Sequence, residues 1–310
     1  MSKNLDLLRR YILITPAKNE EKNLPNLISS VLNQTNKPIL WVIVDDGSED
    51  NTPDIIMEAK RKHSWIQDVH LEEHPRDIGK RYAYVCNRGF DYALKYLKKH
   101  DLKYEYIGVL DADMILEHDF YSRLIEEFEK NPKLGIASGG EYFYDADNKL
   151  VLEEVRDETP VGCMRLWRRE CFEEVGMYPI SYSPDSVSNV LAKLRGWEIK
   201  MFREIKAIQT RRTSSAEGLW KGYKIHGESA YFRNYHPLFA MAKGLKYLSK
   251  RPYYTGIAYL YGYFSSFLKR MDKIDNKEVR DYYWNKHKEV AQFYWTKLKN
   301  KLLVGNNEKM

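Results

Sequence analysis

The chain has 310 residues, of which 43% are hydrophobic and 30% charged, which excludes a disordered polymer and predicts one large domain with an appendage, or two domains. The net charge of +6 is unevenly spread, because residues 206–310 carry 21 Lys and Arg against 8 Asp and Glu, whereas residues 1–205 carry 29 against 36. The three cysteines are scattered and form no CxxC pair, which favours a reducing, cytoplasmic setting.

Four short apolar runs, rich in β-branched residues, are typical of strands buried on both faces of a parallel sheet. They lie at 11–15, 40–44, 106–110 and 134–138. Between them, apolar residues recur with helical spacing at 20–34, 80–99 and 118–130. This alternation predicts right-handed βαβ units and an α/β fold whose sheet is covered by helices on both faces.

Polar or acidic residues follow each of the first three predicted strands. These segments read PAKNEE (16–21), DDGSEDNT (45–52) and DADM (111–114). In open α/β sheets, ligands bind beyond the carboxyl ends of the strands. The sequence therefore predicts a polar binding site at this edge of the sheet.

The third segment places two carboxylates one residue apart after a buried strand. In an extended backbone, Asp111 and Asp113 point to the same side. Carboxylates favour hard cations such as Mg²⁺ or Mn²⁺, which usually complete their coordination with water and substrate phosphates. The pattern thus fits a divalent metal that carries a diphosphate. The alternative is an exposed turn in which Asp113 caps the next helix.

These three segments, in this order, resemble family 2 glycosyltransferases with the GT-A fold, over roughly Tyr11 to Arg203. The resemblance implies a Rossmann-like, mostly parallel central sheet flanked by helices. It also implies an inverting enzyme that moves a sugar from a nucleoside-diphosphate sugar to a hydroxyl, with Mg²⁺ or Mn²⁺ on the diphosphate.

The resemblance also implies roles for individual residues. The base and ribose pocket would be lined by Pro16, Ala17, Asn19, Glu20, Asp45 and Asp46. Asp111, Ala112 and Asp113 would face the ribose and the metal, and Lys80 would contact the donor. The alternative for Asp45 and Asp46 is a plain strand-to-helix turn, and for Lys80 a solvated charge at a helix start.

An inverting transfer needs a general base for the acceptor hydroxyl. In YSPDSVSNVLAKLRGW, Pro184 fits the first turn of a helix that Gly196 ends, so Asp185 lies where the helix dipole favours a carboxylate. The family places its base at such a point, commonly in a Glu-Asp pair, and here Pro184 precedes Asp185. The next candidates are Glu141, Glu153 and Glu154.

The basic, aromatic-rich region 206–310 is predicted to be a mainly helical extension of a catalytic domain at 1–205. Arg211 and Arg212 are candidates for binding donor phosphates. In some GT-A enzymes a histidine approaches the metal or the diphosphate, and the resemblance makes His226 the candidate for that role here. The apolar run 253–268 is shorter than the ~18 residues that a spanning helix needs. It predicts either docking on an anionic membrane or packing against the catalytic domain.

The expected acceptor is a lipid-linked oligosaccharide or polysaccharide precursor, such as a polyprenyl-phosphate-linked sugar, at the cytoplasmic face of the membrane. One alternative function is sugar nucleotide synthesis, but such an enzyme would have a glycine-rich loop after the first strand, and TPAKNEEKN has no glycine. Another is a non-catalytic nucleotide- or nucleic-acid-binding module. Nucleic acid is not the expected partner, because the chain has no RNP-like or zinc motif.

Overall fold

A computed structural model describes residues 9–73, 80–145, 147–153, 159–210 and 218–288. The chain forms two compact units that divide after Thr213. The predicted division at residue 205 falls inside a strand that runs to Gln209, and the assignment of domains stays a prediction.

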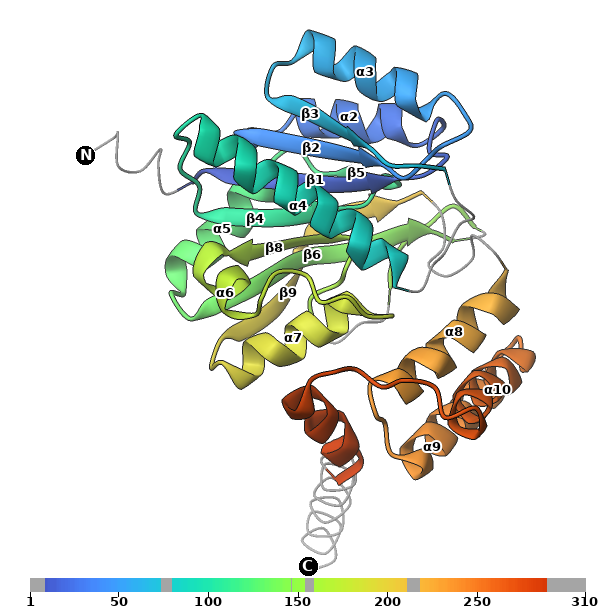
Figure 1. The fold of residues 1–310 in the computed structure, drawn as a ribbon. Coiled ribbons are helices and arrows are strands. Elements are labelled where there is room, and N and C mark those ends of the chain that lie inside the picture. Colours follow the sequence, from blue (N-terminus) through green and yellow to red (C-terminus); the bar gives the residue numbers. More distant parts are fainter. Residues whose placement is uncertain (1–8, 74–79, 146, 154–158, 211–217, 289–310) are drawn as a thin grey trace, which may run out of the picture. The chain divides into compact units, whose positions relative to one another are not determined.

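The first unit is built around one sheet, which has nine strands within the described residues (Figure 1). The strands are β1 (Tyr11–Ala17), β2 (Leu40–Asp45), β3 (Ile66–His70), β4 (Tyr106–Leu110), β5 (Met114–Leu116), β6 (Leu134–Tyr144), β7 (Leu150–Leu152), β8 (Met164–Arg168) and β9 (Glu198–Gln209). Their order is β3-β2-β1-β4-β8-β6-β9-β5, and β7 pairs with β6. The helices are α2 (Leu24–Leu32), α3 (Thr52–Lys62), α4 (Arg81–Lys99), α5 (Phe120–Lys130), α6 (Arg169–Glu174) and α7 (Pro184–Leu194).

The first four strands of that order, β3, β2, β1 and β4, run parallel, as the alternation of strands and helices predicts. β8 then inserts antiparallel between β4 and β6, while β6 and β9 run parallel to each other. The α/β fold and the four predicted strands are confirmed. The sequence prediction missed β3, β5, β7, β8 and β9, because these strands are short, amphipathic or partly exposed.

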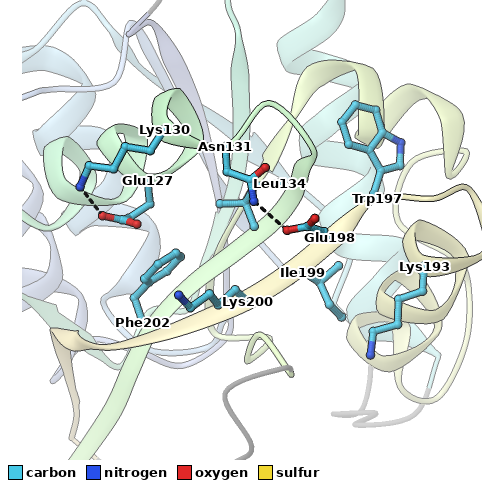
Figure 2. Close-up of a pocket in the computed structure, with 10 residues that line it drawn as sticks. All are labelled: Glu127, Lys130, Asn131, Leu134, Lys193, Trp197, Glu198, Ile199, Lys200 and Phe202. Carbon is cyan, nitrogen blue, oxygen red and sulfur yellow. Dashed lines mark hydrogen bonds and ion pairs between the residues drawn. The ribbon is translucent and has the colours of Figure 1, made fainter.

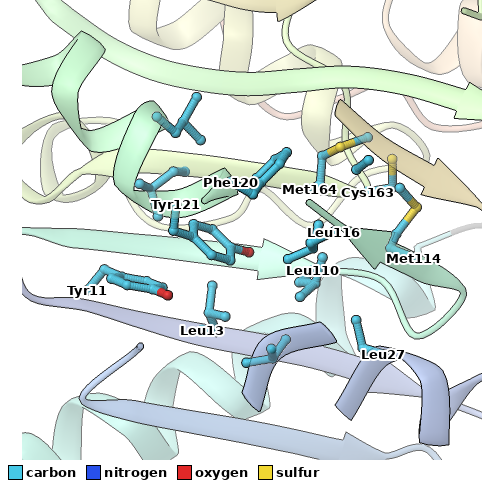
Figure 3. Packing of buried hydrophobic residues seen from close by; sticks show 14 of the residues in the cluster. Tyr11, Leu13, Leu27, Leu110, Met114, Leu116, Phe120, Tyr121, Cys163 and Met164 are labelled. Atoms are coloured by element: carbon cyan, nitrogen blue, oxygen red, sulfur yellow. The ribbon is translucent and has the colours of Figure 1, made fainter. Parts of the chain in front are cut away.

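Successive residues of β1 and β2 face opposite layers of helices. Leu13 and Trp41 belong to a cluster of buried side chains that includes residues of α2, α3 and α5, part of which Figure 3 shows. Ile14 and Val44 face α4, where a Cβ on Gly89 would lie 2.4 Å from Ile14 Cγ2. Glycine at this position therefore lets α4 lie close to the sheet. The rings of Tyr11 and Tyr121 pack with their centroids 4.6 Å apart in the opposite layer.

The second unit contains α8 (Leu219–Phe232), α9 (Pro237–Leu248) and α10 (Tyr254–Leu268), and a further helix begins at residue 277. A Cβ on Gly227 would lie 2.0 Å from Tyr259 O, and a Cβ on Gly262 would lie 2.0 Å from Lys224 O, so the backbones of α8 and α10 touch at glycines. α10 buries Tyr259 and Tyr263 but exposes Tyr254, Ile257 and Tyr261. Among the described residues, no helix has the length and hydropathy required to cross a bilayer.

Candidate active site

The loops after β1 and β2 are joined at the carboxyl edge of the sheet. Ala17 pairs with Asp45 in the β1–β2 ladder, and the Asp46 N–H donates to Ala17 O at 2.8 Å. Lys18 Nζ donates to the carbonyls of Asp46 and Gly47, both at 2.9 Å. The predicted nucleoside-binding segments 16–20 and 45–46 therefore form one continuous surface.

Asn19 and Glu20 connect this surface to the first turn of α3. Asn19 has φ +56°, a conformation that Asn tolerates better than most residues. Its Oδ1 accepts from the N–H of Glu49 at 2.8 Å. The Glu20 N–H donates to Thr52 Oγ1 at 2.8 Å, and its buried carboxylate accepts from Asn23 Nδ2 at 2.7 Å. Both residues thus hold the loop in its conformation.

Asp45 and Asp46 are buried, and each is held by specific donors. Asp45 Oδ1 accepts from the Ser48 N–H at 3.1 Å, and Asp45 Oδ2 lies 3.3 Å from His70 Nδ1 at the end of β3. Asp46 Oδ1 accepts from Nε and Nη2 of Arg81, at 3.1 and 2.9 Å. Sequence reasoning missed Arg81 and His70 because each reaches its aspartate from another element.

Asp111 and Asp113 follow β4, but through a turn at residues 112–113 instead of the extended backbone that was predicted. Asp111 Oδ1 accepts from Tyr82 Oη at 2.6 Å. Burial raises the pKa of Asp111 to about 7, helped by the charges of Asp113, Glu141 and Glu20 and opposed by the Tyr82 hydrogen bond. Asp113 does not cap the next helix, since α5 begins after Asp119. The charge of Asp113 acts on Asp111, so the two carboxylates are near neighbours, and their joint role in metal binding stays a prediction.

This donor set fits a hard divalent cation held jointly with a diphosphate. Besides burial, the charges of Asp113, Glu141 and Glu20 all raise the pKa of Asp111, and a cation would relieve this repulsion. No group of three or more His, Cys, Asp or Glu in the described part of the chain could hold a metal ion. Asp111 and Asp113 would accordingly supply one or two ligands and leave the remaining positions to substrate and water.

Asp185 lies in the first turn of α7, as predicted, and Gly196 follows the helix with φ +86°. A Cβ on Gly162 would lie 3.3 Å from Asp185 Cβ, so the turn before β8 packs against this side chain. Burial raises the pKa of the Tyr178 phenol, and the charges of Arg165, Asp185 and Asp111 also act on it. Asp185 and Asp111 thus both lie near enough to one buried tyrosine to act on its pKa.

The structure gives fewer contacts for the other predicted site residues. Lys80 precedes α4, and its Nζ lies 5.7 Å from the centre of the Tyr182 ring. His226 is an exposed residue of α8 in the second unit, with its ring 5.5 Å from that of Tyr223. Arg211, Arg212 and Glu154 lie outside the described residues. Pro16 and Ala17 end β1, and Ala112 is buried between the two aspartates.

The remaining candidate bases lie on or beside β6. Glu141 is buried on β6 and acts on the pKa of Asp111. The N–H of Glu153 donates to Glu141 O at 2.9 Å.

A surface groove of about 480 Å³ lies at the opposite edge of the sheet, where β6 and β9 begin (Figure 2). Its charges are mixed: Lys130 pairs with Glu127 at 2.6 Å, and Asn131 Nδ2 donates to Glu198 Oε2 at 2.7 Å. The lining residues are Glu127, Lys130, Asn131, Leu134, Lys193, Trp197, Glu198, Ile199, Lys200 and Phe202. None of the predicted site residues lines this groove.

Comparison with known proteins gives both relatives in sequence and neighbours in structure. The chain is similar to poly-β-1,6-N-acetyl-D-glucosamine synthases of Staphylococcus epidermidis, with 31% identity over 47% of this chain and 32% of one relative, and 24% identity over 78% of this chain and 60% of another. It therefore spans no more than 60% of the length of these relatives.

Solved structures share the fold. They include residues 1–349 of S. aureus TarS in complex with UDP, at a TM-score of 0.53 and 14% identity over 86% of this chain and 95% of that one. The mannosyltransferase PcManGT from Pyrobaculum calidifontis, in complex with GDP-Man and Mn²⁺, matches at a TM-score of 0.52. Its sequence is 13% identical, and the match covers 88% of this chain and 83% of that one. The model of glycosyl transferase family 2 matches residues 12–178, more than half of the chain and the whole carboxyl edge from β1 to β8, so the chain belongs to glycosyl transferase family 2.

Proposed function

We propose that this family 2 glycosyltransferase is an inverting, metal-assisted enzyme that uses a nucleoside-diphosphate sugar, with UDP-N-acetylglucosamine as the first donor to test. The observation that carries the proposal is the cluster of carboxylates at the carboxyl ends of β1, β2 and β4, where Asp111 has a pKa of about 7. The names of the relatives and of the UDP-bound neighbour support this choice of donor.

The nucleoside would lie along the surface made by the first two loops. Asp45 and Asp46 are held by their own donors, so both side chains are oriented before a ligand arrives. Pro16, Ala17, Asn19 and Glu20 would form the other wall, with Lys80, Arg211 and Arg212 near the phosphates. Such preformed walls favour binding because little side-chain freedom is lost.

Asp111 and Asp113 would hold Mg²⁺ or Mn²⁺ against the diphosphate. When bound, the cation would neutralise the charge of the leaving nucleoside diphosphate. Tyr82 keeps Asp111 oriented through its 2.6 Å hydrogen bond. Asp113 lies beside Thr210, whose N–H donates to Asp113 O at 2.9 Å, so its backbone is tied to the end of β9.

Asp185 would act as the general base. The acceptor oxygen would attack the anomeric carbon as the bond to the diphosphate oxygen breaks, and its proton would pass to the Asp185 carboxylate, with inversion. Asp185→Asn should lower turnover by about 10² to 10⁴ and leave UDP affinity unchanged. Near-normal turnover in that variant would transfer the role to another residue, of which Glu141 is the first to test.

A thermal-shift panel tests the donor and the metal together. The protein is heated with UDP, UDP-N-acetylglucosamine or GDP-mannose, each with Mn²⁺ or with EDTA. A nucleotide at about 100 times its dissociation constant should add about 2.7 kcal/mol of stability. Asp113→Ala should lose the Mn²⁺-dependent part of that gain. The proposal fails if no nucleotide stabilises the protein in Mn²⁺.

The proposed acceptor is a polyprenyl-phosphate-linked saccharide at the cytoplasmic face of the membrane, reached by peripheral binding. One face of α10 is uncharged and exposed, with Tyr254, Ile257, Tyr261 and Leu268 at helical spacing. Trp220 of α8 lies beside it, 6.5 Å from the rings of both Tyr254 and Tyr261. Basic residues flank the helix at Lys250, Arg251, Lys269 and Arg270. Aromatic side chains between basic groups favour an anionic bilayer surface.

Liposome flotation tests this surface. We expect binding to phosphatidylglycerol vesicles, little binding to phosphatidylcholine vesicles, and weakening by salt, because the Debye length falls to about 3 Å at 1 M. Replacing Lys269 and Arg270 by glutamine, or Ile257 by serine, should reduce binding. Lys277→Gln is the control, since Lys277 is exposed but pairs with Asp281 at 2.6 Å. If the intact protein stays unbound on anionic vesicles at low salt, the membrane proposal is wrong.

Family membership argues against the two alternative functions considered from the sequence, sugar nucleotide synthesis and nucleic-acid binding. Of the described features, the carboxylate-rich carboxyl edge also disfavours nucleic acid, whose phosphates it would repel.

A further inference from the structure

Arg165 of β8 is a completely buried cation whose hydrogen-bond partners are neutral. Its Nε donates to Val161 O at 3.0 Å, and its Nη2 donates to Pro160 O at 2.8 Å. Its Nη1 donates to Asp185 O at 3.2 Å and lies 3.4 Å from Ser188 Oγ. Within the described residues, no carboxylate forms an ion pair with this guanidinium.

A buried charge without a counter-ion is costly, and an apolar side chain would fill the same space more cheaply. What the guanidinium supplies instead is a rigid fork of donors. The fork joins two segments that are separated in the sequence, the turn at 160–163 and the first turn of α7. Ser188 strengthens the second attachment, because its Oγ also accepts from Trp167 Nε1 at 3.2 Å.

Both joined segments carry groups of the candidate active site. In the turn, Cys163 O accepts from the Asp111 N–H at 2.8 Å, and Gly162 packs against the side chain of Asp185. In α7, the Asp185 carbonyl itself accepts from Arg165. The 160–163 turn therefore contacts Asp111 through Cys163 and Asp185 through Gly162, and the Arg165 guanidinium holds this turn and the Asp185 backbone together.

We propose that Arg165 is a positioning residue, which fixes the Asp185 carboxylate relative to the Asp111 end of the site by clamping the 160–163 turn to the first turn of α7. This inference rests on the proposed role of Asp185. A displacement of about 1 Å can cost ~10²-fold in rate, so loss of the clamp should lower turnover while nucleotide binding persists.

The test compares Arg165→Lys with Arg168→Lys. Arg168 is a matched control on the same strand, because its guanidinium also donates to backbone carbonyls, those of Leu134, Phe128 and Asn131. These carbonyls lie toward the opposite edge of the sheet, near the start of β6. Lysine keeps the charge in both variants but loses the fork.

Three measurements separate positioning from stability: the melting temperature, turnover and KM with UDP-N-acetylglucosamine and Mn²⁺, and amide hydrogen exchange. Arg165→Lys should lower turnover about 10- to 100-fold at unchanged KM and speed exchange at residues 185–188. Arg168→Lys should lose comparable stability yet keep turnover and the protection of residues 185–188. Equal effects of the two variants on turnover and exchange would overturn the proposal.

Asp185→Asn distinguishes this inference from the proposed function. If Asp185→Asn retains turnover, the general-base assignment is wrong, and the positioning role falls with it. If Asp185→Asn is inactive but Arg165→Lys behaves like Arg168→Lys, only the positioning role is wrong. Should UDP-N-acetylglucosamine not be turned over, the exchange measurement still decides whether Arg165 holds the first turn of α7.

Discussion

Replacing Asp111 by asparagine should make the ligand-free protein more stable and at the same time less able to bind its donor. The pKa of Asp111 is raised from an ordinary value of 3.8 to about 7, chiefly by burial and by the charge of Asp113. Between about pH 4 and pH 7, Asp111 keeps its proton in the folded state, whereas the unfolded chain has released it. The stability of the folded state therefore falls as the pH rises through that window.

The raised pKa lowers the stability of the folded state by about 4 kcal/mol at pH 8, where Asp111 is ionised in both states, and by about 2 kcal/mol at pH 5, where only the unfolded chain has released the proton, at 1.36 kcal/mol for each tenfold change in proton affinity. Asparagine carries no charge, and its Oδ1 can still accept from Tyr82, as Asp111 Oδ1 does at 2.6 Å. Asp111→Asn should therefore raise the free energy of unfolding by about the same amounts at the two pH values. For a unit of this size, the gain corresponds to a rise in melting temperature of roughly 8 to 16 °C at pH 8 and about half as much at pH 5.

Calorimetry of the protein in EDTA, without nucleotide, measures the effect at both pH values. Asp54→Asn is the control, because Asp54 is an exposed residue in the first turn of α3 and its replacement should change stability by less than about 0.5 kcal/mol. The same Asp111→Asn protein should lose Mn²⁺-dependent affinity for UDP. A variant that is no more stable than the parent at pH 8 would refute the reasoning.

Two further predictions concern packing and the thiols. Gly227→Ala should lower the melting temperature of the second unit, since its Cβ would lie 2.0 Å from Tyr259 O and force α8 from α10; an unchanged melting temperature would contradict this contact. Burial raises the pKa of Cys171 to about 12 and those of Cys86 and Cys163 well above their ordinary value, so at pH 8 only about 10⁻⁴ of Cys171 is thiolate. Iodoacetamide at pH 8 should leave all three unlabelled until urea unfolds the chain.

The fold could be predicted from the sequence where a single segment carried the signal. β1, β2, β4 and the first residues of β6 are mostly apolar runs, and α5 has a clear apolar stripe. The strand β8 gave no such signal, because it includes the buried Arg165, whose partners lie in other segments. Antiparallel insertion of β8 between β4 and β6 depends on long-range pairing that periodicity does not encode.

The same distinction applies to the site. Asp45 ends β2, Asp46 follows it, and Asp111 and Asp113 come just after β4, so the rule that ligands bind at carboxyl strand ends finds them. Tyr82, which holds Asp111 from α4, was not predicted, because the hydrogen bond joins residues 29 positions apart. A tyrosine near a helix start has no sequence signature that distinguishes this role from ordinary packing.

A crystal structure with UDP-N-acetylglucosamine and Mn²⁺, with anomalous data recorded at the manganese edge, tests the central claim most directly. The claim is that the carboxylates after β4 hold the metal and donor diphosphate together. We expect one anomalous peak about 2 Å from an oxygen of Asp111 or Asp113 and from the diphosphate, with uracil against the loops after β1 and β2. A nucleotide bound elsewhere, for example in the groove where β6 and β9 begin, or a diphosphate bound with no manganese beside either aspartate, would contradict it.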